Sequence, residues 1–185
     1  MAQWPGLIWD ACTLINLAAT GRAEEVLRSM GCPCFVVQKV REDEVISLRP
    51  MPDENPIVKR HLLDLSPLLV NDALQDVVLT DEEQEMFVDL AVDLDDGEAM
   101  TLSVASHRRL WMVTDERKAI RLAAQLPVPV MILTTPVWLK NWADVRAVSS
   151  EMLDEVQVQV ETRARYHPHV TDPLYNWWFH RSEES

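Results

Sequence analysis

Short apolar runs alternate with longer amphipathic stretches along this chain. Three runs of three or four apolar residues lie at 7–9, 34–37 and 110–113, and this length is typical of buried strands. Each run precedes a stretch whose apolar residues recur three and four positions apart, at 11–19, 39–48 and 116–126. That spacing predicts helices with one face toward a core. Strands that alternate with helices favour parallel strands joined by crossovers.

The remaining elements follow from the same spacing. We expect a further strand at 127–133 and an edge strand at 76–79. We expect helices at 23–30, 57–65, 81–94, 99–106, 134–142 and 151–165. Residues 156–160 alternate with period two, so a strand remains an alternative there. Residues 167–185 show no period and are expected to be irregular.

Together these elements predict a three-layer α/β/α fold with a central, mainly parallel sheet of four to five strands. The chain has 185 residues, 48% of them apolar, which suits one globular domain with a substantial core. Residues 1–144 would form this domain. Residues 145–185 would be an extension of it, made of a helix and a Trp-rich segment. The clustered aromatic residues of that segment are expected to pack on the domain or to form a homodimer or partner interface.

The net charge of −13 does not favour binding of nucleic acid by the surface as a whole. Binding to phosphates would need local groups of basic residues. Two candidate groups are residues 107–109, and Arg117 with Lys118 and Arg121.

The three cysteines, Cys12, Cys32 and Cys34, are expected to be reduced. Three thiols cannot all pair, and residues 32–34 are too close in sequence for an easy disulfide. Reduced thiols are typical of a cytoplasmic protein. The N-terminus has no basic and apolar leader, and no apolar stretch approaches the ~20 residues that span a bilayer. We therefore expect a cytoplasmic protein without a membrane partner.

Four acidic residues occupy comparable places in the predicted fold. Asp10 and Asp115 end apolar runs, and Glu44 and Glu98 lie early in predicted helices. The carboxyl ends of parallel strands meet at the edge where open α/β sheets bind ligands. Carboxylates gathered there repel one another unless a cation lies between them, and oxygen ligands suit Mg²⁺ or Mn²⁺. The pattern indicates metal-dependent phosphodiester chemistry, although helix capping remains the alternative for each acid.

Neighbouring residues leave further alternatives open. Glu42 and Asp43 compete with Glu44 for the position that faces the site. Additional candidate metal ligands are Asp43, Asp96 and Glu116, and candidate substrate-binding side chains are Thr114 and Asn16.

Four segments of the chain resemble the PIN domain family, especially its compact prokaryotic branch of toxin-type ribonucleases. They are Asp10-Ala11 with Leu14-Ile15-Asn16-Leu17, Val40 with Glu44, Gly97-Glu98-Ala99, and Thr114-Asp115 with Lys118-Ala119. The resemblance covers roughly residues 7–142. It implies a parallel sheet flanked by helices and a Mg²⁺ or Mn²⁺ site formed by Asp10, Glu44, Glu98 and Asp115. The implied activity is endonucleolytic hydrolysis of RNA.

The resemblance also implies the partners. The substrate would be single-stranded RNA, and a toxin of this kind would bind an antitoxin protein. Cys12 departs from the family pattern, which often has Ser or Asn at this position. Together with the acidic surface and the long extension, Cys12 favours the alternative hypothesis: a catalytically weak or inactive PIN-like protein that acts as a protein-interaction module.

Overall fold

In a computed structural model, a five-stranded sheet with all strands parallel forms the centre of the molecule. The structure describes residues 4–45, 47–52, 54 and 60–179. The strand order is β5-β2-β1-β6-β7. The strands are β1 (Leu7–Trp9), β2 (Cys34–Val37), β5 (Gln75–Val77), β6 (Trp111–Val113) and β7 (Ile132–Leu133). The predicted α/β class and the number and direction of the strands are confirmed.

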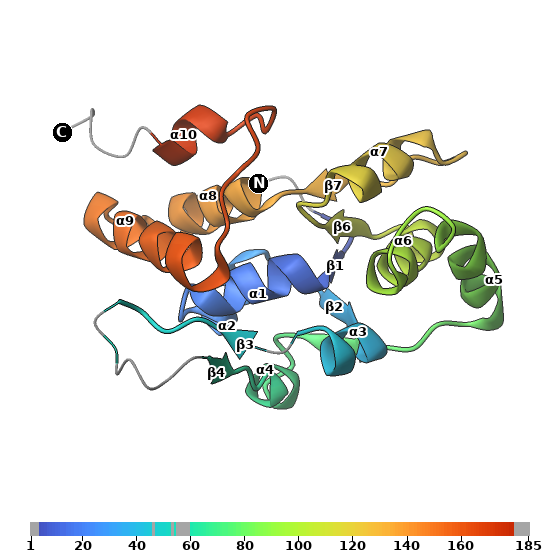
Figure 1. The fold of residues 1–185 in the computed structure, drawn as a ribbon, viewed down its shortest axis with the longest axis horizontal. Helices are drawn as coiled ribbons and strands as arrows, with labels where there is room; N and C mark the ends of the chain where they lie inside the picture. Colours follow the sequence, from blue (N-terminus) through green and yellow to red (C-terminus); the bar gives the residue numbers. More distant parts are fainter. Residues whose placement is uncertain (1–3, 46, 53, 55–59, 180–185) are drawn as a thin grey trace.

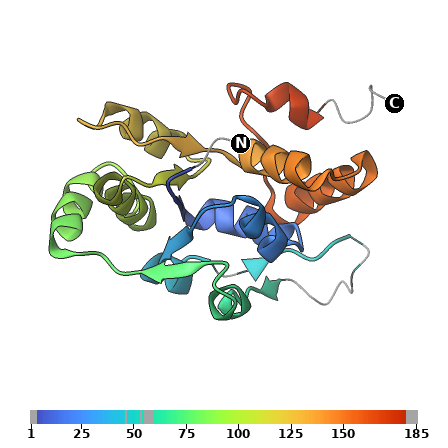
Figure 2. The same cartoon turned by 180° about the vertical axis from the view of Figure 1, so that it is seen from behind.

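Helices cover both faces of the sheet (Figure 1). One layer contains α1 (Ala11–Ala19), α2 (Ala23–Ser29), α8 (Thr135–Arg146) and α9 (Ser150–Gln159). The other contains α5 (Asp81–Leu90), α6 (Asp96–Arg108) and α7 (Arg117–Gln125). The chain moves from β1 through β2 to the edge strand β5, and then returns across the sheet to β6 and β7. Right-handed crossovers that run in these two directions place their helices on opposite faces. Figure 2 shows the same arrangement from behind.

Burial on both faces explains why the strands are continuous apolar runs. All three residues of β1 are fully buried. The Trp9 ring packs on Trp138 of α8 with centroids 5.6 Å apart. In register, Trp9 lies beside Val36 and Val113. The strands therefore end side by side, and the residues that follow them are brought to one edge of the sheet.

The helix predicted at 39–48 is wrong in its second half. Helix α3 (Gln38–Asp43) ends early, and β3 (Ser47–Leu48) pairs antiparallel with β4 (His61–Leu62). Pro50 disfavours helical backbone at the residue before it, so Arg49 is extended more easily than it is helical. The helix predicted at 57–65 is also wrong where the structure describes it, at residues 61–62; residues 57–59 lie outside the described ranges. Helix α4 (Ser66–Val70) follows.

The strand predicted at 127–133 is shorter than expected, because only Ile132 and Leu133 pair with β6. Pro127 and Pro129 have no N–H group to donate to a ladder. Thr80 caps α5 through a reciprocal capping box with Glu83, as good helix-start residues predict.

The C-terminal segment forms helices where the sequence leaves alternatives or predicts none. The helical interpretation of 151–165 is confirmed: α9 continues into a π-helical turn, η1 (Val160–Ala164). Residues 175–179, expected to be irregular, form α10 (Tyr175–Phe179). Residues 180–185 lie outside the described ranges.

The C-terminal extension packs on the rest of the chain. Turn η1 lies against α1. Fully buried Trp178 donates its indole N–H to Glu161 at 2.7 Å and meets the Tyr166 ring edge-on at 5.4 Å. Lys140 of α8 lies 5.9 Å from the centre of the Trp177 ring. Trp178 therefore fixes the extension to the rest of the chain.

Within the described ranges, no helix has the length and apolar character needed to cross a membrane.

Candidate functional site

Asp10 lies at the carboxyl end of β1 and is 2% exposed. Its carboxylate caps α1 by accepting from the Ala11 N–H at 2.8 Å. The other oxygen, Oδ2, accepts from the Thr114 hydroxyl at 3.0 Å and from the Cys12 thiol at 3.3 Å. Burial raises the pKa of Asp10, and these hydrogen bonds oppose that rise. Cys12 thus supplies a hydrogen-bond donor to Asp10, although a thiol donates weakly.

Glu44 is the last residue of the α3 turn and reaches the same edge of the sheet. Its carboxylate lies against Gly97 of α6. A Cβ atom added to Gly97 would lie 2.3 Å from both Glu44 carboxylate oxygens. The absence of a side chain at position 97 is therefore what admits Glu44 to this place. The expectation that Glu44 lies early in a helix is wrong, since it is the helix C-cap.

The structure distinguishes Glu44 from its two acidic neighbours. Asp43 is an exposed residue in an ion pair with Lys39, 2.5 Å away. Glu42 is exposed and accepts from Gln38 and Arg41. Of the three, only Glu44 turns toward Gly97.

Glu98 lies in the first turn of α6, directly after the Gly97 contact. Its backbone N–H donates to the N-cap carboxylate of Asp95 at 2.9 Å. Burial, followed by the charges of Asp95, Asp10 and Glu116, raises the pKa of Glu98 to about 8. Burial, followed by the charges of Asp95 and Asp10, likewise raises the pKa of Glu44 to about 7.

These shifts show that several carboxylates share one region. We call Asp10, Glu44, Asp95, Glu98 and Glu116 the acidic cluster. Within the described part of the chain, none of the five forms an ion pair with Lys, Arg or His. Like charges without a cation favour the protonated forms, which is the direction of the shifts in Glu44 and Glu98.

Asp115 is placed differently from the other predicted ligands. Its Oδ1 accepts from the Thr135 N–H at 2.8 Å and from the Tyr166 hydroxyl at 3.1 Å. Its Oδ2 accepts from Asn16 at 3.0 Å and from the Thr135 hydroxyl at 2.5 Å. Burial raises its pKa to about 6 against these four hydrogen bonds. Asp115 therefore joins α1, the start of α8 and the C-terminal extension, and its oxygens are occupied by donors of the chain.

The predicted substrate-binding side chains are also engaged within the chain. Asn16 donates to Asp115 and to the Thr135 hydroxyl, each at 3.0 Å. The Thr114 hydroxyl donates to Asp10 and accepts from the Glu116 N–H at 3.1 Å. Both residues hold the acids in place in this structure.

The donor set suits a hard divalent cation, because it consists of carboxylate oxygens without a counter-charge. The carboxylates do not form a finished ligand cage: among the described residues, no three Asp, Glu, His or Cys side chains are grouped closely enough to hold one ion. A bound cation would therefore have to draw Glu44 and Glu98 toward Asp10.

Two residues of this region escaped the sequence prediction. The sequence prediction names Asp96 and not Asp95, although Asp95 stands three residues before Glu98, a spacing typical of an N-cap. Tyr166 lies 51 residues from Asp115. A local sequence pattern does not predict a contact over that separation.

No family model, curated protein or solved structure matches this chain.

Proposed function

We propose that the protein is a metal-dependent endoribonuclease that hydrolyses phosphodiester bonds at the acidic cluster. One observation carries the proposal: Asp10, Glu44 and Glu98 converge at the carboxyl edge of a parallel sheet without a cationic partner in the described part of the chain. Carboxylates that share a region raise one another's pKa, and a bound cation would favour their charged forms. The motifs that resemble the PIN family support the same reading.

The proposed roles follow from the positions of the side chains. Asp10, Glu44 and Glu98 would hold Mg²⁺ or Mn²⁺, with Glu116 as a further acid at the rim. Such an ion lowers the pKa of a bound water and offsets charge on phosphate oxygens. Thr114 and Cys12 fix the Asp10 carboxylate by donating to it. Asp115, with its four hydrogen bonds, would position the strand ends and leave coordination to the other acids.

An RNA substrate, and a role as the toxin of a toxin–antitoxin pair, belong to this proposal through the PIN resemblance. A homodimer and a cytoplasmic location remain predictions from the sequence.

A catalytically weak or inactive interaction module is the second candidate, and two observations favour it. Asp10 receives a weak thiol donor from Cys12, and Asp115 has both oxygens occupied by the chain. Such a protein would keep the fold and bind a partner without hydrolysing RNA.

Cleavage of single-stranded RNA with Mn²⁺ separates the two candidates. We expect the purified protein to cleave a labelled RNA with Mn²⁺ but not with EDTA, and Asp10→Asn to abolish cleavage. Asp115→Asn serves as the comparison, because a positioning residue should lose less activity than a ligand. Equal residual cleavage by the wild type and Asp10→Asn would indicate a contaminating nuclease and overturn the proposal.

A further inference from the structure

Two arginines face each other across the β3–β4 pair. Ser47 pairs with Leu62 and Leu48 with His61. Continuing this antiparallel register places Arg49, which follows β3, opposite Arg60, which precedes β4. Like charges directly opposite each other destabilise a ladder. The two charges therefore oppose pairing at this end of the hairpin.

Turn η1 brings two more arginines to the same place. The Arg49 N–H donates to the Arg163 carbonyl at 3.0 Å, and the Arg163 side chain donates back to the Arg49 carbonyl at 3.4 Å. Loss of hydration lowers the pKa of Arg49, and the charges of Arg165 and Arg60 lower it further. We call Arg49, Arg60, Arg163 and Arg165 the arginine cluster.

Nearby carboxylates do not neutralise this cluster by direct pairing. Glu54 is hydrogen-bonded to His61, and Glu161 accepts from Trp178. Across the residues that the structure describes, no member of the arginine cluster forms an ion pair. In the described part of a chain whose net charge is −13, these four arginines gather without an ion pair. The hydrogen bond with His61 lowers the pKa of Glu54, and the charge of Arg163 also acts on Glu54 by lowering its pKa.

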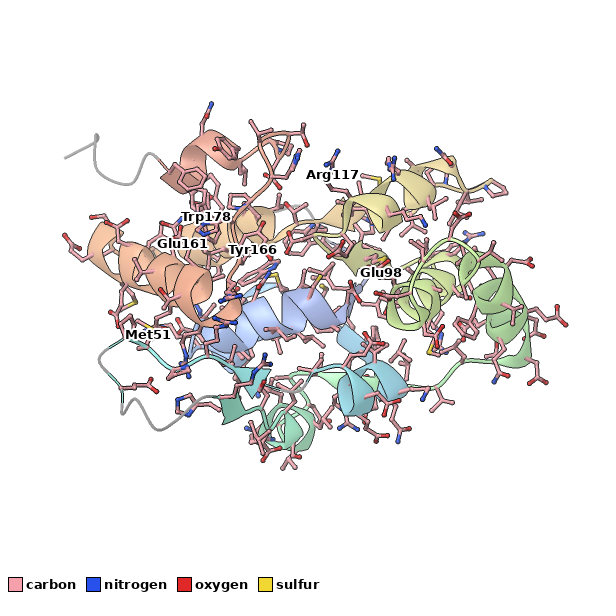
Figure 3. The ribbon with its side chains drawn as sticks, in the orientation of Figure 1. Met51, Glu98, Arg117, Glu161, Tyr166 and Trp178 are labelled. Carbon is pink, nitrogen blue, oxygen red and sulfur yellow. The ribbon has the colours of Figure 1, made fainter. Side chains whose placement is uncertain are left out.

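One member of each cluster lines a cavity, Arg165 of the arginine cluster and Glu116 of the acidic cluster. The cavity has a volume of about 430 Å³ and lies between the start of α7 and residues 165–173. Arg165 and Arg117 line it together with His167 and His169, and Glu116 of the acidic cluster lies on the same wall. Asp172 also lines it, so the cavity holds both charges and suits a nucleotide better than a bare phosphate. Figure 3 shows Arg117 at the start of α7 and Tyr166 below it.

We propose that the arginine cluster binds successive phosphates of single-stranded RNA and that the cavity holds the nucleotide next to the cleaved bond. Arginine suits this task because its planar guanidinium binds phosphate oxygens in pairs. Affinity for nucleic acid depends on such local contacts and not on the net charge of the chain. The assignment of the cavity to the nucleotide beside the cleaved bond rests on the function proposed above, whereas binding of the RNA does not.

The test measures binding in EDTA, where no metal contributes. A fluorescein-labelled RNA of about 12 nucleotides, within the usual site size of single-strand binders, is titrated with the full chain and followed by anisotropy at several salt concentrations. We expect Arg60→Gln with Arg165→Gln to weaken binding roughly tenfold. The slope of log K against log salt should fall by about 1.4, since each phosphate contact on a single strand contributes about 0.7.

The matched control is Arg146→Gln. Arg146 is exposed like Arg60 and Arg165, but it ends α8 beside Glu25 of α2, 3.9 Å away, and it does not line the cavity. It should bind RNA as the wild type does, with the same salt slope. Thermal unfolding checks that all variants fold; should the double variant fail to fold, Arg60→Gln alone replaces it, because Arg60 is exposed and bonds only to Ser47 among the described residues.

The outcomes separate this proposal from the proposed nuclease. Salt-dependent RNA binding that the double variant loses, without cleavage in Mn²⁺, keeps the arginine cluster and overturns the nuclease. Cleavage in Mn²⁺, with both variants binding RNA equally to the wild type, overturns the arginine cluster and keeps the nuclease. A salt slope that Arg146→Gln lowers as much as the double variant also overturns it. Equal binding of DNA of the same sequence supports recognition through phosphates.

Discussion

The contact between Glu44 and Gly97 allows a perturbation that separates cation binding from folding. In Gly97→Ala, the new methyl group would lie 2.3 Å from both Glu44 oxygens, and ordinary contact begins at 3.4 Å. The carboxylate must therefore retreat by about 1.1 Å, about five times the 0.2 Å tolerance of a metal–ligand distance. Glu44 is a flexible side chain, so the retreat costs little folding free energy. Alanine instead favours the helix by roughly 0.5–1 kcal/mol.

We therefore expect Gly97→Ala to unfold at the same temperature as the wild type or above it in EDTA, and to lose about half of the stabilisation that Mn²⁺ gives the wild type. The assay is thermal unfolding over a MnCl₂ titration. A ligand at about 100 times its Kd stabilises by about 2.7 kcal/mol, and a tenfold weaker Kd removes about 1.4 kcal/mol of binding free energy.

Two further variants test whether the displacement of Glu44 causes the loss of the Mn²⁺ response. Ser106→Ala changes propensity in the same helix more than two turns away and should keep the Mn²⁺ response of the wild type. Glu44→Asp in the Gly97→Ala background is one methylene shorter and should recover part of it. An unchanged Mn²⁺ response in Gly97→Ala would refute the reasoning, because a displaced Glu44 could not then be a ligand.

Three further predictions concern stability. The pKa of Glu98 is raised from 4.5 to about 8 in the folded protein, so the folded state holds a proton that the unfolded state loses. Metal-free stability should therefore fall as the pH rises from about 4.5 to about 8. Urea unfolding at several pH values checks this, and a slope as steep in Glu98→Gln would contradict it. Tyr166→Phe removes one of four hydrogen bonds to Asp115 and should lower the free energy of unfolding in urea by about 1.5–3 kcal/mol. A loss below the error of the measurement would show that this hydrogen bond does not stabilise the fold. Arg108→Ala leaves the buried Glu83 carboxylate without the guanidinium that binds both its oxygens at 2.7 and 2.8 Å. It should cost about 3 kcal/mol, and an unchanged urea midpoint would show that the pair contributes nothing.

The arginine cluster also bears on how an acidic chain could bind RNA. The sequence suggests two basic groups, residues 107–109 and the first turn of α7. Arg108, however, forms an ion pair with Glu83 of α5. The four clustered arginines come from three segments that are distant in sequence. An overall charge of −13 would then repel RNA from most of the surface and leave one region for it.

Local pattern was sufficient where neighbours in sequence decide the structure. The apolar runs around Ile8, Val36 and Met112 predict buried parallel strands, because only strands covered on both faces are apolar throughout. The cap at Thr80 and the first-turn position of Glu98 follow from adjacent residues. The convergence of Asp10 and Glu98 at one edge follows from parallel topology.

The tertiary structure decided what depends on partners far along the chain. Residues 47–48 form a strand because residues 61–62 pair with them. Local secondary-structure propensity does not predict this pairing. The choice of Glu44 over Glu42 depends on the space at Gly97. The residues around Asp115 are the same whether its carboxylate binds a cation or a hydroxyl group of the chain. The hydrogen bond from Tyr166, 51 residues away, shows that the carboxylate binds the hydroxyl. Sequence determined which residues reach the edge of the sheet, and long-range packing determined which carboxylates remain open there, because a carboxylate's neighbours in space are set by the whole fold.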